Sequence, residues 1–260
     1  MQDITLVLNT AEKRVQFALF RAGSMLCAED WLAQRGGTEL LAPALRHACA
    51  RLGFTPAAIG RIACVAGPGN FTGLRIGLTT ASALARAVHA RQAGINYLQC
   101  LAANAPAREG EEVLVLTNAR QGLAYGARFR ADEAGLPVPM GRTFLLPLPP
   151  LPEGFLPGSP AFVLGSAVNS NLECLRQALP ASTRILTGDA AIPTPASLAA
   201  MERAIRWELE DQSDIPPLYM RDCDAVENLD AIARAQGRTP EIAHQELERL
   251  THASLTLVED

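Results

Sequence analysis

The sequence predicts an α/β fold made of two similar lobes. Three short apolar runs within the first 32 residues alternate as β-strands do, and the patterns that follow complete the order βββαβα. A second series of strands begins near Val113, where Leu114-Val-Leu-Thr-Asn-Ala repeats the opening Leu6-Val-Leu-Asn-Thr-Ala. If the repeat reflects a duplication, two similar lobes face each other across a cleft.

The spacing of apolar residues predicts each element of the first lobe. Leu41, Ala44, Leu45, Ala48 and Leu52 recur at helical intervals, with Thr38 suited to cap this helix and Gly53 to end it. In order, the sequence predicts strands at 4–8, 15–20 and 25–32, a helix at 38–52, a strand at 62–66 and a helix from 74 to about 89.

The second lobe is predicted less clearly than the first. Eight prolines fall between Leu136 and Pro160, and proline lacks an amide donor, so this stretch is expected to be an extended surface segment rather than a central strand. Further elements are predicted as a strand at 161–164, a helix at 169–178, a strand at 184–186 and helices at 195–209 and 240–250. We expect an N-terminal lobe at 1–107, a second lobe at 108–221 and a C-terminal extension at 222–260.

Composition excludes several classes of function. Lys and Arg total 23 against 27 Asp and Glu, for a net charge of −4. This charge argues against a chain that binds nucleic acid without a partner protein. The six cysteines form no C-x-x-C motif and the four histidines form no metal-binding pair, so no metal site is expected. No apolar run is long enough to span a membrane, and the start of the chain has no signal-peptide pattern, so a cytoplasmic protein is expected.

The most distinctive segment is the glycine-rich turn at 67–73, between a predicted buried strand and a helix. Gly73 is followed by Leu74 rather than Lys, which excludes a Walker A loop, and no acidic residue occurs between Leu74 and Arg108 to hold a dinucleotide ribose. Two interpretations stay open at this point. The turn either binds an anion at the start of the helix or has the structural role of starting that helix without a ligand.

Small residues follow one another along this helix. Gly73, Gly77, Ala81 and Ala85 recur every four residues and form a ridge with almost no side chain. Two glycines inside a helix cost roughly 2 kcal/mol relative to alanine, so a neighbour must approach closely. That neighbour is the sheet of the same lobe, another subunit, or both on different faces of the helix.

Residues 67–78, Gly-Pro-Gly-Asn-Phe-Thr-Gly-Leu-Arg-Ile-Gly-Leu, resemble the signature of the TsaB (YeaZ) family. Members are bacterial accessory subunits for making threonylcarbamoyladenosine in transfer RNA. The resemblance extends over roughly residues 3–221 and includes Asn9-Thr10-Ala11, Asn118-Ala119-Arg120 and Pro217-Leu218-Tyr219-Met220-Arg221.

The resemblance implies an actin-like (ASKHA, or ribonuclease H-like) fold with two lobes and mixed sheets. Family members pair through the N-terminal lobe, as homodimers or with the related catalytic subunit TsaD, which carries a metal and performs the transfer. The ATPase TsaE joins that complex, ATP or ADP is expected only at the complex interface, and tRNA is contacted only through the complex. By position, the pairing surface is expected to include Thr38, Leu41, Leu45, Phe71, Thr72, Gly73, Leu74, Gly77, Leu78 and Ala81.

The sequence departs from the family pattern at three positions. Asn9 and Asn118 stand where relatives usually have Asp, and Gly37 stands where a histidine is common. An asparagine cannot act as a base or as an anionic metal partner, which makes phosphoryl transfer by this chain alone unfavourable. Candidate residues for an anion or nucleotide are Asn9, Thr10, Gly67, Gly69, Asn70, Arg75 and Asn118.

These observations favour a non-catalytic scaffold that binds a TsaD-like partner. The alternative is an actin-like ATPase or small-molecule kinase that uses the cleft between the lobes, an interpretation that rests on fold analogy alone. A protease is disfavoured because the sequence contains no G-x-S-x-G motif.

Overall fold

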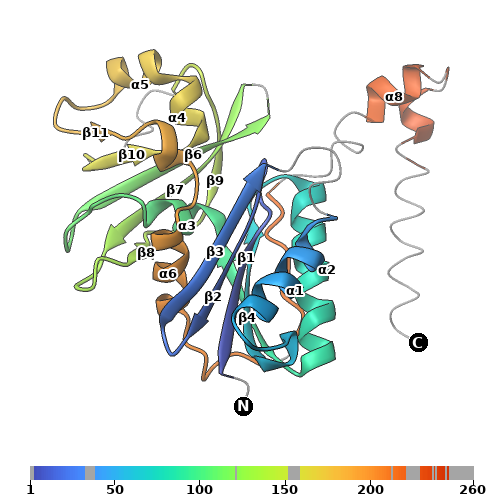
Figure 1. The fold of residues 1–260 in the computed structure, drawn as a ribbon. Helices are drawn as coiled ribbons and strands as arrows, with labels where there is room; N and C mark the ends of the chain where they lie inside the picture. The colour runs from blue at the N-terminus through green and yellow to red at the C-terminus, as the bar shows by residue number, and fades with distance from the viewer. Residues whose placement is uncertain are drawn as a thin grey trace. The chain divides into compact units, whose positions relative to one another are not determined.

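The computed structural model describes residues 3–32, 39–120, 122–151, 159–211, 213–220, 229–235, 237, 239–243 and 245. The chain folds into two compact units, which are Met1–Tyr219 and Met220–Asp260. The first unit contains both lobes (Figure 1), and the second contains helix α8 (Leu229–Ala235). The predicted lobe boundaries at 107 and 221 stay predictions, and most of the predicted helix at 240–250 lies outside the described residues.

The first lobe is built on a five-stranded mixed sheet in the order β3-β2-β1-β4-β5. Strands β1, β2 and β3 form an antiparallel meander, and β4 and β5 add to it in parallel. This arrangement agrees with the predicted βββαβα order. The strands are β1 (Ile4–Asn9), β2 (Arg14–Arg21), β3 (Ser24–Leu32), β4 (Ile59–Gly67) and β5 (Arg91–Asn96).

Helices cover both faces of this sheet (Figure 1). Helices α1 (Leu41–Arg51) and α2 (Phe71–Val88) pack on the face that carries Ile4, Leu6 and Leu8. Helices α3 (Tyr97–Ala102) and α6 (Pro195–Ala204) contact β1, β2 and β4 between them. Because both faces are covered, β1 is buried along its whole length and shows no polar alternation.

The two long helices of this lobe begin at positions that differ from the prediction. Helix α2 begins at Phe71 rather than Leu74, because the Asn70 side chain accepts a hydrogen bond from the amide of Gly73 at 3.0 Å and caps the helix. Helix α1 begins at Leu41, with Leu40 in the N-cap position, so the predicted cap at Thr38 is wrong. Thr38 itself lies outside the described residues.

Strand β5 and helix α3 were not predicted, because their sequences lack a clear period. Strand β5 contains Gln92 and Gly94 and shows no alternation. Five of the six residues of α3 are buried, so it shows no polar face, and its cap is Asn96, whose side chain accepts from the amide of Leu98 at 2.8 Å. A short 3₁₀ helix, η1 (Pro56–Ala58), precedes β4.

The second lobe repeats the topology of the first. Strands β6 and β7 form an antiparallel pair, and β10 and β11 add in parallel beyond β6, as β4 and β5 do beyond β1. The order β7-β6-β10-β11 therefore matches β2-β1-β4-β5 and agrees with the repeat seen in the sequence. The strands are β6 (Glu112–Arg120), β7 (Leu123–Ala131), β10 (Phe162–Leu164) and β11 (Arg184–Ile185).

The proline-rich segment is extended but is not only a surface segment. It supplies β8 (Pro137–Pro139) and β9 (Phe144–Pro147), which both pair with β7, and it buries Leu146 and Leu148 in the core of the second lobe. Proline can sit in these strands because β8 is an edge strand and Pro147 ends β9. The expectation of a surface segment was therefore wrong for these two leucines.

The remaining elements of the second lobe are shorter than predicted. The helix expected at 169–178 is two helices, α4 (Ser166–Ser170) and α5 (Leu172–Ala178), separated by Asn171 in a non-helical conformation. Helix α6 ends at Ala204 instead of 209, and the 3₁₀ helix η2 (Gly188–Ala191) precedes it.

The small-residue ridge of α2 packs on the sheet of its own lobe. A Cβ atom on Gly73 would collide with the carbonyl oxygen of Thr10, and one on Gly77 would collide with the Thr10 hydroxyl. Ala81 and Ala85 are buried in the same core. Of the two neighbours considered for the ridge, the structure supports the intramolecular one.

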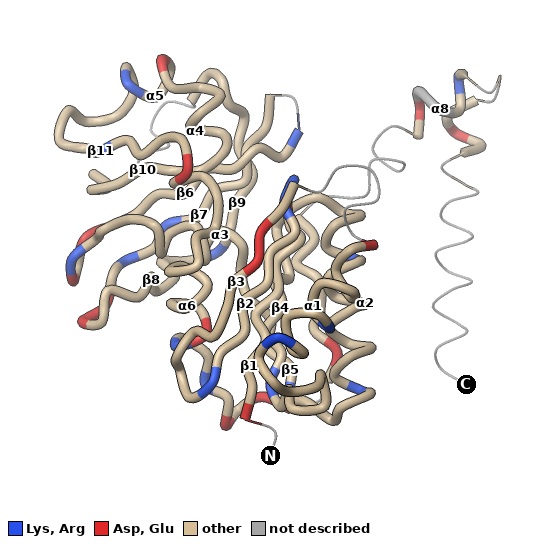
Figure 2. Tube along the Cα trace, in the orientation of Figure 1, with Lys and Arg blue, Asp and Glu red and all other residues tan. Residues whose placement is uncertain are grey.

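Charged residues occur along the backbone of both lobes, with Lys and Arg positions interleaved with Asp and Glu positions (Figure 2). Among the described residues, no helix is both long enough and apolar enough to cross a membrane.

We predict that Gly73→Ala lowers the free energy of unfolding by about 1–3 kcal/mol, because the added methyl group must push α2 away from the Thr10 backbone. Urea unfolding followed by circular dichroism measures the effect. The matched control is Thr79→Ala on the exposed side of the same helix, which we expect to change stability by less than about 0.5 kcal/mol. Equal stabilities of the two variants would contradict the close approach.

Candidate functional site

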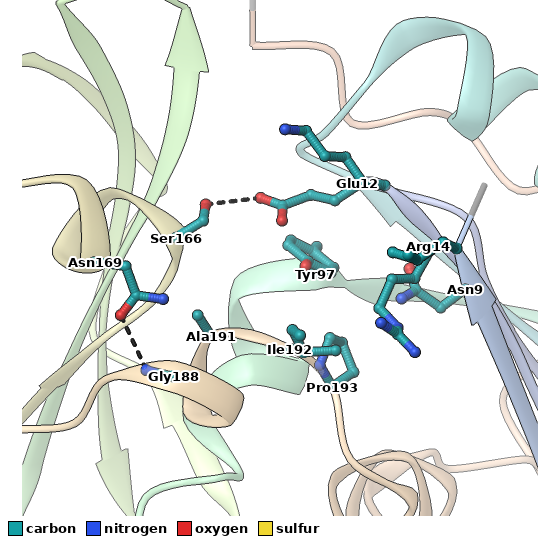
Figure 3. Close-up of a pocket in the computed structure, with 12 residues that line it drawn as sticks. Asn9, Glu12, Arg14, Tyr97, Ser166, Asn169, Gly188, Ala191, Ile192 and Pro193 are labelled. Atoms are coloured by element: carbon teal, nitrogen blue, oxygen red, sulfur yellow. Dashed lines mark hydrogen bonds between the residues drawn. The ribbon is translucent and has the colours of Figure 1, made fainter. Parts of the chain in front are cut away.

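A cavity of about 230 Å³ lies between the two lobes (Figure 3). The first lobe contributes residues from the turn between β1 and β2 and from the end of β3, and the second lobe contributes residues from α4 and η2. The lining residues are Asn9, Glu12, Lys13, Arg14, Leu32, Tyr97, Ser166, Asn169, Gly188, Ala191, Ile192 and Pro193.

Glu12 crosses from one lobe to the other (Figure 3). Its carboxylate accepts a hydrogen bond from the Ser166 hydroxyl on α4 at 3.0 Å, and it is also hydrogen-bonded to Tyr97 on α3. Burial raises the pKa of Glu12, while these two hydrogen bonds and the charge of Lys13 act in the opposite direction. Burial raises the pKa of Tyr97 well above its ordinary value, so the phenol stays protonated. This part of the cavity therefore holds a carboxyl group that gives up its proton less readily than usual.

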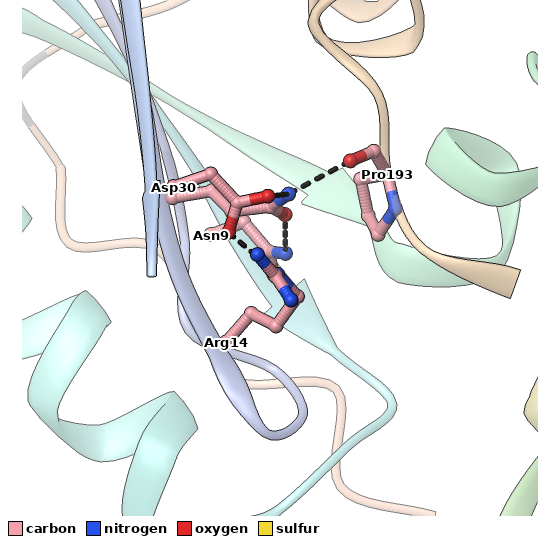
Figure 4. A network of polar contacts seen from close by, with 5 residues as sticks. Asn9, Arg14, Asp30 and Pro193 are labelled. Carbon is pink, nitrogen blue, oxygen red and sulfur yellow. Dashed lines mark hydrogen bonds and ion pairs between the residues drawn. The ribbon is translucent and has the colours of Figure 1, made fainter. Parts of the chain in front are cut away.

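A second set of contacts centres on Gln16 of β2 (Figure 4). Its amide nitrogen donates to the Pro193 carbonyl at 2.7 Å and to Asp30 at 3.1 Å, and its amide oxygen accepts from Asn9 at 2.7 Å. Arg14 donates to Asp30 at 2.6 Å, so Asp30 is shared by the two donors. These bonds connect the first lobe to the segment that leads into α6.

The two asparagines that replace expected carboxylates have different surroundings. The Asn9 side chain is buried; its nitrogen donates to Gln16 at 2.7 Å, and its oxygen accepts from the amide of Ala11 at 3.0 Å. The Asn118 amide donates to the Ser166 hydroxyl at 3.0 Å, and its side chain donates to Ser170 at 3.3 Å. Asn118 therefore supports the residue that holds Glu12, without itself lining the cavity.

The glycine-rich turn packs on the turn between β1 and β2. The Asn70 amide donates to the carbonyl of Ala11 at 2.6 Å, and a Cβ atom on Gly69 would collide with that same carbonyl. A Cβ atom on Gly67, whose φ is +125°, would lie 2.7 Å from the carbonyl oxygen of Leu218. These close approaches account for both glycines without a ligand.

The seven predicted anion residues do not gather at one point. Asn9 lines the cavity, Thr10 donates to the carbonyl of Gly73 at 2.8 Å, and Asn70 caps α2. Arg75 lies over the Phe71 ring, 4.1 Å from its centroid. The structure thus favours the interpretation of this turn as one that launches a helix, and an anion site there stays a prediction.

The predicted pairing surface stays a prediction, and half of its residues are buried in the chain's own fold. Phe71, Gly73 and Leu78 are half-buried, and Thr72 is exposed. The exposed side of α2 is instead a stripe formed by Thr72, Arg75, Thr79, Ala83 and Arg86. The buried members of the predicted set are Leu41, Leu45, Leu74, Gly77 and Ala81.

Sequence reasoning missed most of the residues that line the cavity. Glu12 follows the Asn9-Thr10-Ala11 segment directly, and its place in a turn between two buried strands was the available signal. Ser166 and Asn169 belong to no motif, and only the packing of α4 against β6 brings them to the cavity.

Comparisons with known proteins agree with this architecture. Residues 31–145 match the model of a family described as TsaD, tRNA N6-adenosine threonylcarbamoyltransferase. The tRNA threonylcarbamoyladenosine biosynthesis protein TsaB of Escherichia coli (strain K12) is 31% identical over 132 residues, which cover 50% of this chain and 57% of that protein. The structure of YeaZ from Pseudomonas aeruginosa superposes with a TM-score of 0.69 at 21% identity, over 84% of this chain and 100% of that one.

These matches agree with the resemblance of residues 67–78 to the TsaB (YeaZ) family. The YeaZ structure confirms an α/β fold with two lobes and mixed sheets. The matched region of the curated TsaB protein is a little over half of its length. Activity, substrates and partners are therefore treated as proposals below.

We predict that Glu12→Gln gains stability relative to the parent chain as the pH rises. A carboxyl group whose pKa is raised by folding contributes most at low pH, and that contribution is lost as the pH rises through its folded pKa. Glutamine keeps an oxygen for Ser166 and carries no charge. Urea unfolding at pH ~4 and pH ~7 measures the change.

The control for this prediction is Glu133→Gln, at an exposed carboxyl group beyond the end of β7. We expect its stability difference from the parent chain to be similar at both pH values. A fall in the stability of Glu12→Gln relative to the parent chain between pH ~4 and pH ~7 would contradict the raised pKa.

Proposed function

We propose that this chain is a non-catalytic accessory subunit for the formation of threonylcarbamoyladenosine in tRNA, acting by binding a TsaD-like catalytic partner. Its support is the similarity to the TsaB protein, whose name assigns it to that biosynthesis, and the match to the TsaD family model. A TsaE-like ATPase, a homodimer in the absence of the partner, and ATP or ADP at the complex interface belong to the same proposal.

The main support for a non-catalytic role is the amide side chain of Asn9, which stands where an aspartate is expected. In active members of this fold class, an aspartate after the first strand handles metal-bound phosphate. Here the residue is an amide whose nitrogen and oxygen are both engaged within the protein, by Gln16 and by the Ala11 amide. It carries no negative charge, so it can act neither as a base nor as an anionic ligand of the metal that holds such a phosphate.

Contact with tRNA through the partner is consistent with the charge of the chain. The net charge is −4, and along the backbone of the described residues the basic positions are interleaved with acidic ones (Figure 2). A protein that grips RNA by itself gathers positive charge along the path of the phosphates. The proposal accordingly assigns most phosphate contacts to the partner.

The docking surface in this proposal is the exposed stripe of α2. At its start, the rings of Phe71 and Tyr219 lie 5.0 Å apart and Arg75 covers Phe71, so an aromatic cluster stands beside a helix with small exposed side chains. Farther along, Arg86 pairs with Asp214 at 2.6 Å. Small residues such as Thr79 and Ala83 allow a partner helix to approach closely.

The alternative is an ATPase or small-molecule kinase that uses the cavity between the lobes. Glu12 favours it, because this side chain is a carboxyl group of raised pKa that lines the cavity. ATP turnover by the isolated chain that is lost in Glu12→Gln would support this alternative over the accessory role.

We predict that Ala83→Arg weakens the complex with a TsaD-like partner from the same organism by at least about tenfold, because a long charged side chain replaces a small one at the centre of the contact. Native mass spectrometry and titration calorimetry measure the stoichiometry and the affinity, with and without ATP. The same mass measurement on the chain alone tests the homodimer.

Ala178→Arg is the matched control. It makes the same change at an exposed helical position on α5, in the second lobe, and we expect it to leave the affinity unchanged. If Ala83→Arg binds as tightly as this control, the stripe on α2 is not the docking surface. If neither variant nor the parent chain binds the partner, the accessory role itself is wrong.

A further inference from the structure

Most hydrogen-bond acceptors that line the interlobe cavity already have a donor within the protein, whereas several donors there lack an acceptor among the described residues. On the acceptor side, the Glu12 carboxylate is engaged by Ser166 and Tyr97, and the side-chain oxygen of Asn169 accepts from the amide of Gly188 at 3.1 Å. The oxygen of Asn9 is also engaged, by the amide of Ala11. Each of these three side chains therefore already accepts a hydrogen bond from a donor within the protein.

Three hydrogen-bond donors of the cavity, in contrast, have donor groups without an acceptor among the described residues. Lys13 makes no hydrogen bond or ion pair within the described part of the chain, although it is close enough to Glu12 to lower its pKa. Among the described residues, Arg14 binds Asp30 through Nε, and its two terminal nitrogens have no acceptor there. The side-chain nitrogen of Asn169 also has no hydrogen-bond partner among the described residues. A ligand that completes this cavity must bring acceptor oxygens.

The rest of the lining is apolar. Leu32 comes from the end of β3, Ala191 ends η2, and Ile192 and Pro193 follow it on the way to α6. The volume of about 230 Å³ is below the roughly 300–1,000 Å³ of sites that hold drug-sized ligands. The cavity therefore suits a small molecule with a charged group and a short apolar body.

We propose that the cavity between the lobes binds a small organic anion, a carboxylate or a phosphate monoester. Its charged oxygens lie against Lys13, with Arg14 and Asn169 on other walls of the cavity, and its apolar part lies on Ile192 and Pro193. This site is separate from the exposed stripe of α2, so the proposal does not depend on partner binding.

Binding of such an anion is linked to protonation of the Glu12 carboxyl group. The groups that face its carboxyl are Lys13 on the same turn, Ser166 on α4 and Tyr97 on α3, and the Arg14–Asp30 pair stands on the neighbouring strands. An anion beside Glu12 disfavours its ionised form, so binding takes up a proton and becomes tighter as the pH falls. Removing this charge as Glu12→Gln is expected to tighten binding.

The single lysine makes the test specific. Lys13 is the sole lysine of the chain, so reductive methylation with ¹³C-formaldehyde places one labelled side chain at the cavity and keeps its positive charge. The probes are propionate, methyl phosphate and, as a cation of similar size, propylammonium. We expect saturable shifts of the Lys13 signal with one or both anions and none with propylammonium, and the tighter anion identifies the charged group.

Variants complete the test by titration calorimetry on the full chain. We expect Lys13→Met to weaken anion binding by about tenfold and Glu12→Gln to tighten it and to remove its pH dependence. The control is Arg142→Gln, an exposed arginine outside the cavity lining, which should leave the affinity unchanged. The proposal is overturned if neither anion produces a saturable shift, if propylammonium binds equally well, or if Glu12→Gln weakens binding.

Discussion

The structure depends on the packing of the β1–β2 turn against the first turn of α2. Thr10 donates its hydroxyl hydrogen to the carbonyl of Gly73, and the carbonyl of Ala11 accepts from the amide of Asn70. Side chains at positions 69 and 73 would fill the space in which these backbones meet, so glycine is required at both. One contact therefore positions the signature helix on its sheet and also holds Glu12 toward the second lobe.

From that turn, polar contacts continue into the second lobe. Glu12 reaches Ser166, Gln16 reaches the carbonyl of Pro193, and Asn104 donates to the carbonyl of Ile192 at 2.7 Å. Because each of these bonds joins segments far apart in the sequence, the lobes are positioned by directional interactions as well as by apolar packing. The cavity between them has polar walls with a definite geometry, which is what selective recognition of a small charged molecule requires.

The same arrangement separates two surfaces with different proposed roles. The exposed side of α2 carries small and polar residues beside the Phe71–Tyr219 pair and suits a protein partner. The cavity, on the far side of the β1–β2 turn, has unused donors and suits an anion. The β1–β2 turn contributes Glu12 to the cavity and contacts the buried side of α2 at Gly73 and Gly77.

The amino-acid sequence by itself determined the βββαβα order, the repeat of the two lobes and the signature segment, because apolar period and glycine spacing are local properties. Tertiary structure alone decided which side of α2 is exposed: Gly77 and Ala81 face their own sheet, and the stripe through Thr79 and Ala83 faces outward. It also assembled the cavity, since Glu12 and Ser166 lie 154 positions apart and meet only when the lobes pack. Contacts between distant segments leave no period in a sequence, and for that reason the carboxyl group in the cleft became visible only in the fold.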